Sequence, residues 1–284
     1  MKLRIAAITD EFSPDLPTAL DAMQNAALTG VELRVIGSKN ILDLDDRELE
    51  QVRDLVRARG FEIVSIASPL LKCVLPNAPA LDQRFQHDVF ASKHTFDDQD
   101  RLAARAFAIA RMLGARIVRV FSYWRTMEPE KTHEAVIAAL HKLGDTAAEH
   151  NLIIGLENEH ACNISTGADA AAILPRVGRS NVKLVWDPAN AFVSGEKAFP
   201  DGYRKLPPDS IVHVHAKDCR MKDAHTPEWG AVGDMDVNWK GQIGALLADG
   251  YNGWISLETH WTGPHGNKLE ASTICAQRLH TLLS

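Results

Sequence analysis

Short β-branched segments alternate with longer segments rich in alanine and leucine along the whole chain. The β-branched segments have the length and composition of strands, and they cover residues 3–10, 30–36, 61–69, 115–122, 152–159, 182–189, 211–218 and 254–260. Between them, apolar residues recur at the three- and four-residue spacing of one helix face, as over 100–113 and 133–147. Eight strands alternating with eight helical segments predict an α/β fold, a single-domain (β/α)8 barrel.

An open, doubly wound sheet is the alternative fold for such an alternation. That fold usually has fewer strands, and the first predicted strand is not followed by a Gly-x-Gly-x-x-Gly sequence. We therefore favour the closed barrel, in which functional residues gather at the carboxyl ends of the strands. Two connections that leave such ends, residues 70–95 and 219–236, are too long for simple turns, and we interpret them as candidate lids.

Local signals also indicate where helices begin and end. Ser13 and Pro14 predict the start of the first helix, because serine caps a helix and proline suits its first turn. Glycine allows the left-handed backbone that stops a helix. It stands just before predicted strands at Gly30, Gly60, Gly114, Gly250 and Gly253.

Composition and charge narrow the class of protein. The 284 residues are 45% hydrophobic and 24% charged, as in globular domains. Neither a membrane-spanning apolar run nor a secretory signal is evident, so we expect a cytoplasmic protein without a membrane partner. The net charge of −6 disfavours nucleic acid as a partner. The sequence leaves open whether copies assemble as a homo-oligomer.

The four cysteines lie far apart in the sequence, at Cys73, Cys162, Cys219 and Cys275. This spacing fits neither a zinc cage nor a disulfide framework, and we expect reduced thiols.

Alternation along the later strands assigns polar side chains to the barrel interior, because successive residues of a strand face opposite sides. In 211–218, Val212, Val214 and Ala216 suit the helix layer, so His213 and His215 should point inward. The same alternation turns inward, from the three other late strands, Gly155, Glu157, Asp187, Ser256, Glu258 and His260.

Four of these residues should meet near the carboxyl ends of successive strands, namely Glu157, Asp187, His215 and Glu258. Carboxylates crowded in a barrel mouth repel one another and are costly to desolvate. A divalent cation removes that conflict, and a carboxylate/imidazole set suits Mn, Co, Fe, Zn or Mg. We therefore predict one divalent metal ion held by all four residues. The alternative interpretation is that they are separate polar ends of strands.

Ordered motifs along nearly the whole chain resemble the sugar phosphate isomerase/epimerase family, which has the xylose isomerase-like TIM barrel. The motifs are ITDEFS (8–13), GVELRVIGSKNILDL (30–44), SIASPLLK (65–72), RVFSYWR (119–125), GLENEH (155–160), WDPANA (186–191), HVHAKD (213–218) and WISLETH (254–260). The resemblance implies one such barrel domain over residues 1–284.

In that family, a glutamate, an aspartate, a histidine and a glutamate from strands five to eight bind a divalent metal. Glu157, Asp187, His215 and Glu258 match these positions. The resemblance also implies that Glu157 and Glu258 act as the acid/base pair. The implied activity is a metal-dependent isomerase or epimerase of a sugar or sugar derivative, which removes a proton next to a carbonyl and proceeds through an enediolate.

Three features depart from the ketose-type epimerases of the family. Gly233-Asp234-Met235 replaces the Gly-x-Gly turn common after strand seven. Asn190 stands where these enzymes have histidine, and Asn163 stands where they have glutamate. The departures count against a ketose 3-epimerase more than against the metal site. The alternative activity on the same barrel is a metal-dependent dehydratase or lyase of a hydroxy-keto acid or an inositol derivative. An AP-endonuclease-like hydrolase and a non-catalytic sugar-binding protein are further alternatives.

Other polar residues near the predicted mouth could contact a substrate. We predict that hydroxyl, carboxylate or phosphate groups of a small carbohydrate are bound by Arg34, Lys72, His160 and Lys217. Solvated loop charges or structural hydrogen bonds are the alternative roles. His213 lies deeper, and we interpret it as a core histidine. Aromatic residues that could stack on a sugar ring are Trp124, Trp229 and Trp261.

Overall fold

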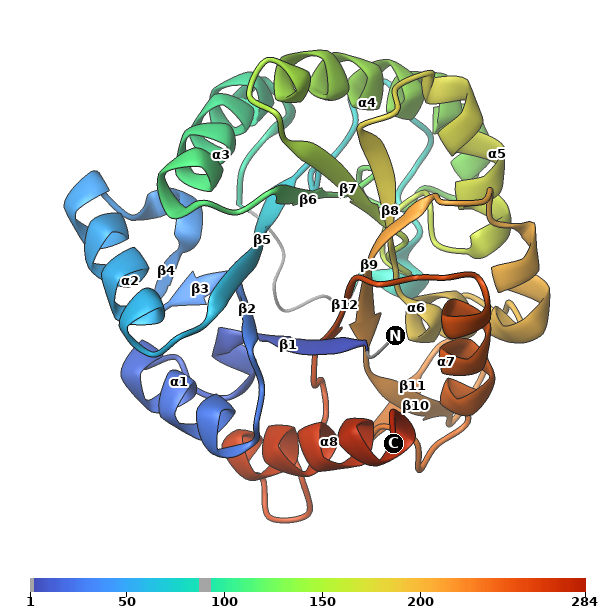
Figure 1. Ribbon diagram of the computed structural model, residues 1–284. Coiled ribbons are helices and arrows are strands. Elements are labelled where there is room, and N and C mark those ends of the chain that lie inside the picture. The colour runs from blue at the N-terminus through green and yellow to red at the C-terminus, as the bar shows by residue number, and fades with distance from the viewer. Residues whose placement is uncertain (1–2, 87–92) are drawn as a thin grey trace.

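The computed structural model describes residues 3–86 and 93–284. Eight of the described strands pair in parallel and close into a barrel, which Figure 1 views down its axis, with helices forming the outer ring. The barrel strands are β1 (Arg4–Ile8), β2 (Gly30–Leu33), β5 (Glu62–Leu70), β6 (Ile117–Val120), β7 (Ile153–Glu157), β8 (Val182–Trp186), β9 (Ile211–Ala216) and β12 (Trp254–Leu257). The predicted (β/α)8 fold is confirmed.

One helix follows each barrel strand. These helices are α1 (Leu16–Asn25), α2 (Asp46–Ala58), α3 (Gln99–Leu113), α4 (His133–Ala148), α5 (Gly167–Val177), α6 (Pro188–Val193), α7 (Trp239–Ala248) and α8 (Lys268–Leu282). Two antiparallel pairs lie outside the barrel, β3 (Val35–Ile36) with β4 (Lys39–Asn40) and β10 (Asp218–Met221) with β11 (Pro227–Gly230). Short helical turns occupy Thr9–Glu11, Ile41–Asp43, Gln83–Phe85, Phe96–Asp98, Pro129–Thr132, Ala198–Gly202 and Tyr203–Lys205.

Three of the predicted helix boundaries are wrong, and one of them is Gly253, because α7 already ends at Ala248. The first helix begins at Leu16, not at Ser13 and Pro14, because Asp15 is its cap and accepts a hydrogen bond from the Thr18 amide. Gly30 does not end a helix but lies inside β2, where a Cβ atom would stand 2.6 Å from the Trp254 ring. Gly114 does end α3, with a φ of +82°.

The barrel wall separates two apolar regions. Outward residues such as Leu156, Trp186 and Leu257 belong to the core between the strands and the helices. Inside the barrel, a small cluster fills the amino ends of the strands and consists of Ala6, Val64, Ile117 and Trp254, with Ile153 and Val212 packed against it. This apolar floor supports the polar residues that lie nearer the carboxyl ends.

Val212 packs against this inner cluster, so its predicted place in the helix layer is wrong. The register explains the difference, since Leu184 pairs with Ile211 whereas Val185 pairs with His213. The extra residue in β9 is a bulge, which locally breaks the alternation of faces.

The two long connections differ in what the structure describes. Residues 87–92, within the predicted lid 70–95, lie outside the described residues. The second connection contains the β10–β11 hairpin, which is anchored by the buried carboxylate of Asp218. That carboxylate accepts backbone hydrogen bonds from Cys219, Gly233, Met235 and Val237. Burial raises the pKa of Asp218 to about 6 despite these four donors.

No helix in the described part of the chain combines the length and the apolar character that a membrane span requires.

We expect Trp254→Ala to lower the free energy of unfolding by about 3–5 kcal/mol, because it empties most of the apolar floor of the barrel. Chemical denaturation monitored by circular dichroism would measure the change. Leu247→Ala, at an exposed position of α7, is the control and should change it by less than ~0.5 kcal/mol. Equal losses for the two variants would contradict this role of Trp254.

Candidate metal centre

The structure brings the four predicted ligands together. Glu157 ends β7, Asp187 directly follows β8, His215 lies near the end of β9 and Glu258 directly follows β12. One ligand atom from each lies within 4.8 Å of all the others, and all four side chains are buried. The Nδ1 atom of His215 is 3.0 Å from Oε1 of Glu157 and 3.6 Å from Oε2 of Glu258. We call these four residues the ligand cluster.

Three basic side chains contact the ligand cluster. The Lys217 ammonium lies 2.8 Å from Oδ2 of Asp187 and 2.6 Å from Oε2 of Glu258. Nη1 of Arg119 is 3.2 Å from Oε2 of Glu157. Nη1 of Arg34 is 3.0 Å from Oε1 of Glu258. These contacts offset part of the repulsion among the three carboxylates.

Burial and neighbouring charges shift the pKa values of the ligands. Burial, together with the charges of Glu157 and Glu258, raises the pKa of Asp187 although Lys217 opposes the shift. Burial alone would lower the pKa of His215, but the carboxylates of Glu157 and Glu32 hold it well above its usual value. Asp187 therefore lies where further positive charge is favourable.

A divalent metal ion fits these residues. Among the described residues, Oε2 of Glu157 and Oδ2 of Asp187 are buried and meet only the ion-pair contacts of Arg119 and Lys217. Three carboxylates and one imidazole form a donor set that first-row divalent ions and magnesium accept. All four groups would act as ligands, and the set does not distinguish among these metals.

Two residues that point into the barrel, Glu32 and Arg119, are not among the site residues predicted from the sequence. Glu32 lies in β2 between the outward Val31 and Leu33, and its Oε1 is 2.8 Å from Nε2 of His213. Arg119 lies in β6 with the outward Val118 on one side. The same alternation that applies to the late strands places both side chains inside the barrel, but it does not show which residues they contact.

His213 is a fully buried histidine beneath the ligand cluster, as predicted. Glu32 is the partner of its Nε2 atom. Its Nδ1 atom has no hydrogen-bond partner in the described part of the chain.

A cavity of about 910 Å³ opens above the ligand cluster. Glu258 lines it, as do three of the four predicted substrate-binding residues, Arg34, Lys72 and His160. The fourth, Lys217, is buried within the cluster instead. Glu157, Asp187 and His215 also lie behind the wall that the described residues form.

Aromatic and imidazole rings form one side of the cavity. Trp229 of β11 lies between His260, with ring centres 4.7 Å apart, and His160, with ring centres 6.5 Å apart. All three line the cavity. Lys72 packs its ammonium against Phe121 and Trp124, at 4.5 Å and 5.4 Å from the ring centres. The wall therefore offers flat apolar faces beside hydrogen-bonding groups, a combination that suits a polyol.

The two asparagines that depart from the ketose epimerases have different surroundings. Asn190 connects the ligand cluster to the cavity wall, since its Oδ1 is 2.8 Å from Nδ1 of His160 and its Nδ2 is 3.4 Å from Oε1 of Glu157. Asn163 holds the loop after β6, because it accepts from the Thr126 amide and donates to the carbonyls of Ser122 and Trp124. The role of Asn163 is therefore structural.

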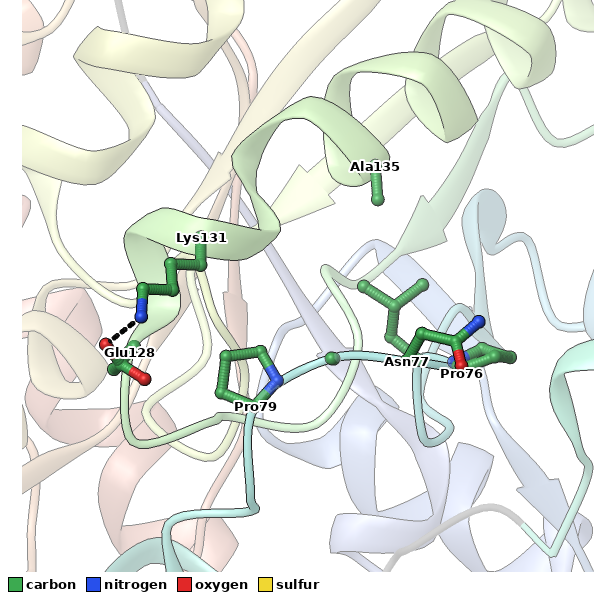
Figure 2. A pocket seen from close by; sticks show the side chains of 8 residues that line it. Pro76, Asn77, Pro79, Glu128, Lys131 and Ala135 are labelled. Atoms are coloured by element: carbon green, nitrogen blue, oxygen red, sulfur yellow. Dashed lines mark ion pairs between the residues drawn. The ribbon is translucent and has the colours of Figure 1, made fainter.

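A second cavity, of about 420 Å³, lies between residues 75–79 and the start of α4. Figure 2 shows Pro76 and Pro79 in its lining, with Glu128 and Lys131 beside them. The only charged residues of this lining are those two, and they pair with each other. It lacks the concentration of ionisable groups found in the barrel mouth, so we place the functional site at the larger cavity.

The chain is similar to known proteins over most of its length. The family model described as xylose isomerase-like TIM barrel matches residues 20–275. Inosose dehydratase of Geobacillus thermodenitrificans (strain NG80-2) is 24% identical over 293 residues, which cover 95% of this chain and 93% of that protein.

Two solved structures share the fold. The IOLI protein, described with a binding zinc atom, has a TM-score of 0.74 at 18% identity and covers 99% of this chain and 97% of its own. D-allulose 3-epimerase from Methylomonas sp., in complex with D-allulose, has a TM-score of 0.72 at 17% identity and covers 100% and 98%.

We expect Asp187→Asn to weaken the binding of divalent metal. The variant removes a charged ligand, while the asparagine Oδ1 can still accept from the Asn190 amide, as Asp187 does at the start of α6. Competition with a chromophoric chelator would measure the affinity. Wild-type protein should also gain about 2.7 kcal/mol of stability at a free metal concentration of 100 times Kd. Unchanged affinity in the variant would remove Asp187 from the ligand set.

We also expect metal binding at neutral pH to release protons. The pKa of His215 lies well above its usual value, so its imidazole is protonated without metal and must lose that proton to act as a ligand. Affinity should therefore fall as the pH is lowered. Calorimetric titrations in buffers of different ionisation enthalpy would count the protons, and an enthalpy independent of the buffer would contradict the expectation.

Proposed function

Because the chain belongs to the xylose isomerase-like TIM barrel family, we propose that it is a metal-dependent enzyme acting on a small polyhydroxylated carbonyl compound. Its first step is removal of a proton from the carbon next to the carbonyl. The observation that carries the proposal is the position of Glu258, which belongs to the ligand cluster and also lines the cavity. A substrate in the cavity would therefore meet a carboxylate and the metal centre at the same place.

Glu258 is held in its ionised form. Burial would raise the pKa of Glu258, but Lys217, His260 and His215 hold it well below its usual range. The carboxylate is thus free of a proton at neutral pH, although its low proton affinity makes it a weak base. Weak bases remove a proton from carbon only when the resulting negative charge is stabilised.

Stabilisation of that charge is available in the barrel mouth. A divalent cation held by Glu157, Asp187, His215 and Glu258 would act as a Lewis acid toward the carbonyl oxygen of the substrate. Arg34 and Lys72 line the cavity and add positive charge near the same region. Trp229, His160 and His260 would orient the ring and hydroxyl groups of the substrate.

We propose dehydration as the outcome of the reaction. This activity requires a proton donor for the departing hydroxyl group, and His160 and His260 lie on either side of Trp229 in the cavity wall. The similarity to inosose dehydratase over 95% of the chain supports it. In this proposal Glu258 takes the proton from carbon, and one of the two imidazoles donates a proton to the leaving hydroxyl.

Isomerisation or epimerisation is the second candidate. It shares the first step with dehydration. Its support is a second carboxylate in the cluster, Glu157, which the resemblance to sugar isomerases implies as the partner of Glu258 in an acid/base pair. The likeness to D-allulose 3-epimerase agrees with this activity. The structural role of Asn163, where the ketose epimerases carry glutamate, counts against it.

Incubating the metal-loaded protein in deuterated water with a ketose, an inosose and a hydroxy-keto acid would test the proposal. Deuterium incorporated next to the carbonyl would report proton removal. A new ultraviolet absorbance of an unsaturated carbonyl would indicate dehydration, whereas a rearranged or inverted product would favour the second candidate. Absence of both exchange and product across the panel would contradict the proposed function.

Glu258→Gln should lower kcat by about 10²–10⁴-fold at saturating metal, because it removes the base while keeping the shape of the side chain. Initial rates measured with bound metal quantified in the same samples would separate loss of the base from loss of the ion. Glu62→Gln, at an exposed position at the start of β5, is the matched control and should keep wild-type rates. Near-normal turnover in Glu258→Gln would refute its assignment.

A further inference from the structure

Glu32 spans the barrel interior beneath the ligand cluster. It projects from β2, and β1 and β12 separate that strand from β9 in the barrel order (Figure 1). Its carboxylate nevertheless reaches two histidines of β9, with Oε1 2.8 Å from Nε2 of His213 and 3.2 Å from Nε2 of His215. All three side chains are fully buried.

His215 is thereby held at both ring nitrogens. Its Nε2 faces Glu32, and its Nδ1 faces Glu157 and Glu258 of the ligand cluster. A neutral imidazole carries a hydrogen on one nitrogen and a lone pair on the other. The same ring can therefore present either a lone pair or an N–H to a metal, depending on which nitrogen keeps the hydrogen.

The carboxylates on the two sides of His215 favour opposite tautomers of its imidazole. Oε1 of Glu157, 3.0 Å away, could accept a hydrogen from Nδ1 and turn the lone pair away from the cluster. Glu32, whose Oε1 is 3.2 Å from Nε2, could instead accept a hydrogen from that nitrogen and leave the Nδ1 lone pair directed at the cluster. Carboxylates that accept from the second nitrogen of a metal-binding histidine fix both its tautomer and its orientation.

His213 holds Glu32 in place from the other side. Its Nε2 bonds to the same carboxylate, and its ring lies edge-on to that of His215 at 5.5 Å between centres. Glu32 therefore cannot turn away from His215 without leaving the buried nitrogen of His213 unpaired, which is costly inside a protein.

We propose that Glu32 is a positioning residue that selects Nδ1 of His215 as the metal-binding nitrogen, with His213 as its support. The inference rests on the metal centre of the proposed function. It assigns a role to a residue of β2 that lies outside the ligand cluster and outside the cavity wall formed by the described residues.

The first test reads the tautomer directly in the wild-type protein. Protein labelled with ¹⁵N-histidine and loaded with Zn²⁺ would be studied by long-range ¹H–¹⁵N correlation spectroscopy. We expect the retained hydrogen of His215 on Nε2 and the zinc-dependent shift on Nδ1. Zinc bound through Nε2 would overturn the proposal, and this result needs no variant to fold.

The second test compares two glutamate variants for Zn²⁺ affinity by chelator competition. Glu32→Gln should bind Zn²⁺ about 10–100-fold more weakly. Glu196→Gln is the matched control, because Glu196 is a mostly buried carboxylate that accepts from the Gly167 and Ala168 amides far from His215. It should lower thermal stability without changing Zn²⁺ affinity.

The outcomes separate this inference from the proposed function. Wild-type protein that fails to bind Zn²⁺, Mn²⁺ or Co²⁺ would overturn both. Wild-type binding with unchanged affinity in Glu32→Gln would overturn only the positioning role. Two ions bound per chain, one of them lost in Glu32→Gln, would also overturn it, because Glu32, His213 and His215 would then be ligands of a second metal.

Discussion

Three carboxylates forced together in a desolvated barrel mouth are the constraint on which the rest of the site depends. Their mutual repulsion is large in a low-dielectric interior, so the fold has to supply positive charge from several directions. Lys217, Arg119 and Arg34 each reach the ligand cluster from a different part of the barrel. The pKa of Asp187 nevertheless stays above its ordinary value, chiefly because the carboxylate is buried. A divalent ion would complete this arrangement.

The barrel interior is layered so that this charge can be tolerated. The apolar floor around Trp254 excludes water from the amino end and holds the strands at close distance. Glu32 and His213 form the next layer and contact each other across the lumen. The ligand cluster follows, and the cavity lies above it. Each layer limits the movement of the next, so a metal site built on strand ends can keep its geometry without depending on loops.

The sequence was informative where strand alternation was regular and uninformative where contacts cross the barrel. Period two placed Glu157, Asp187, His215 and Glu258 correctly, because their outward neighbours are plainly apolar. The predicted place of Val212 was wrong because β9 contains a bulge, and a hydrophobic pattern does not reveal one extra residue in a strand. The start of α1 was predicted too early, because Asp15 caps the helix in preference to Ser13.

Long-range pairing accounts for most of what could not be predicted. Lys217 is predicted from the sequence to bind substrate, yet its ammonium contacts Asp187 and Glu258, which follow other strands. Glu32 becomes significant only through its distance to His215, 183 residues later in the chain. The choice between dehydration and isomerisation has the same origin. In the proposed function it would depend on the proton donor, and His160 and His260 reach the cavity from separate connections. Residues of these connections would then decide the outcome, whereas Glu258, directly after β12, would carry the common first step.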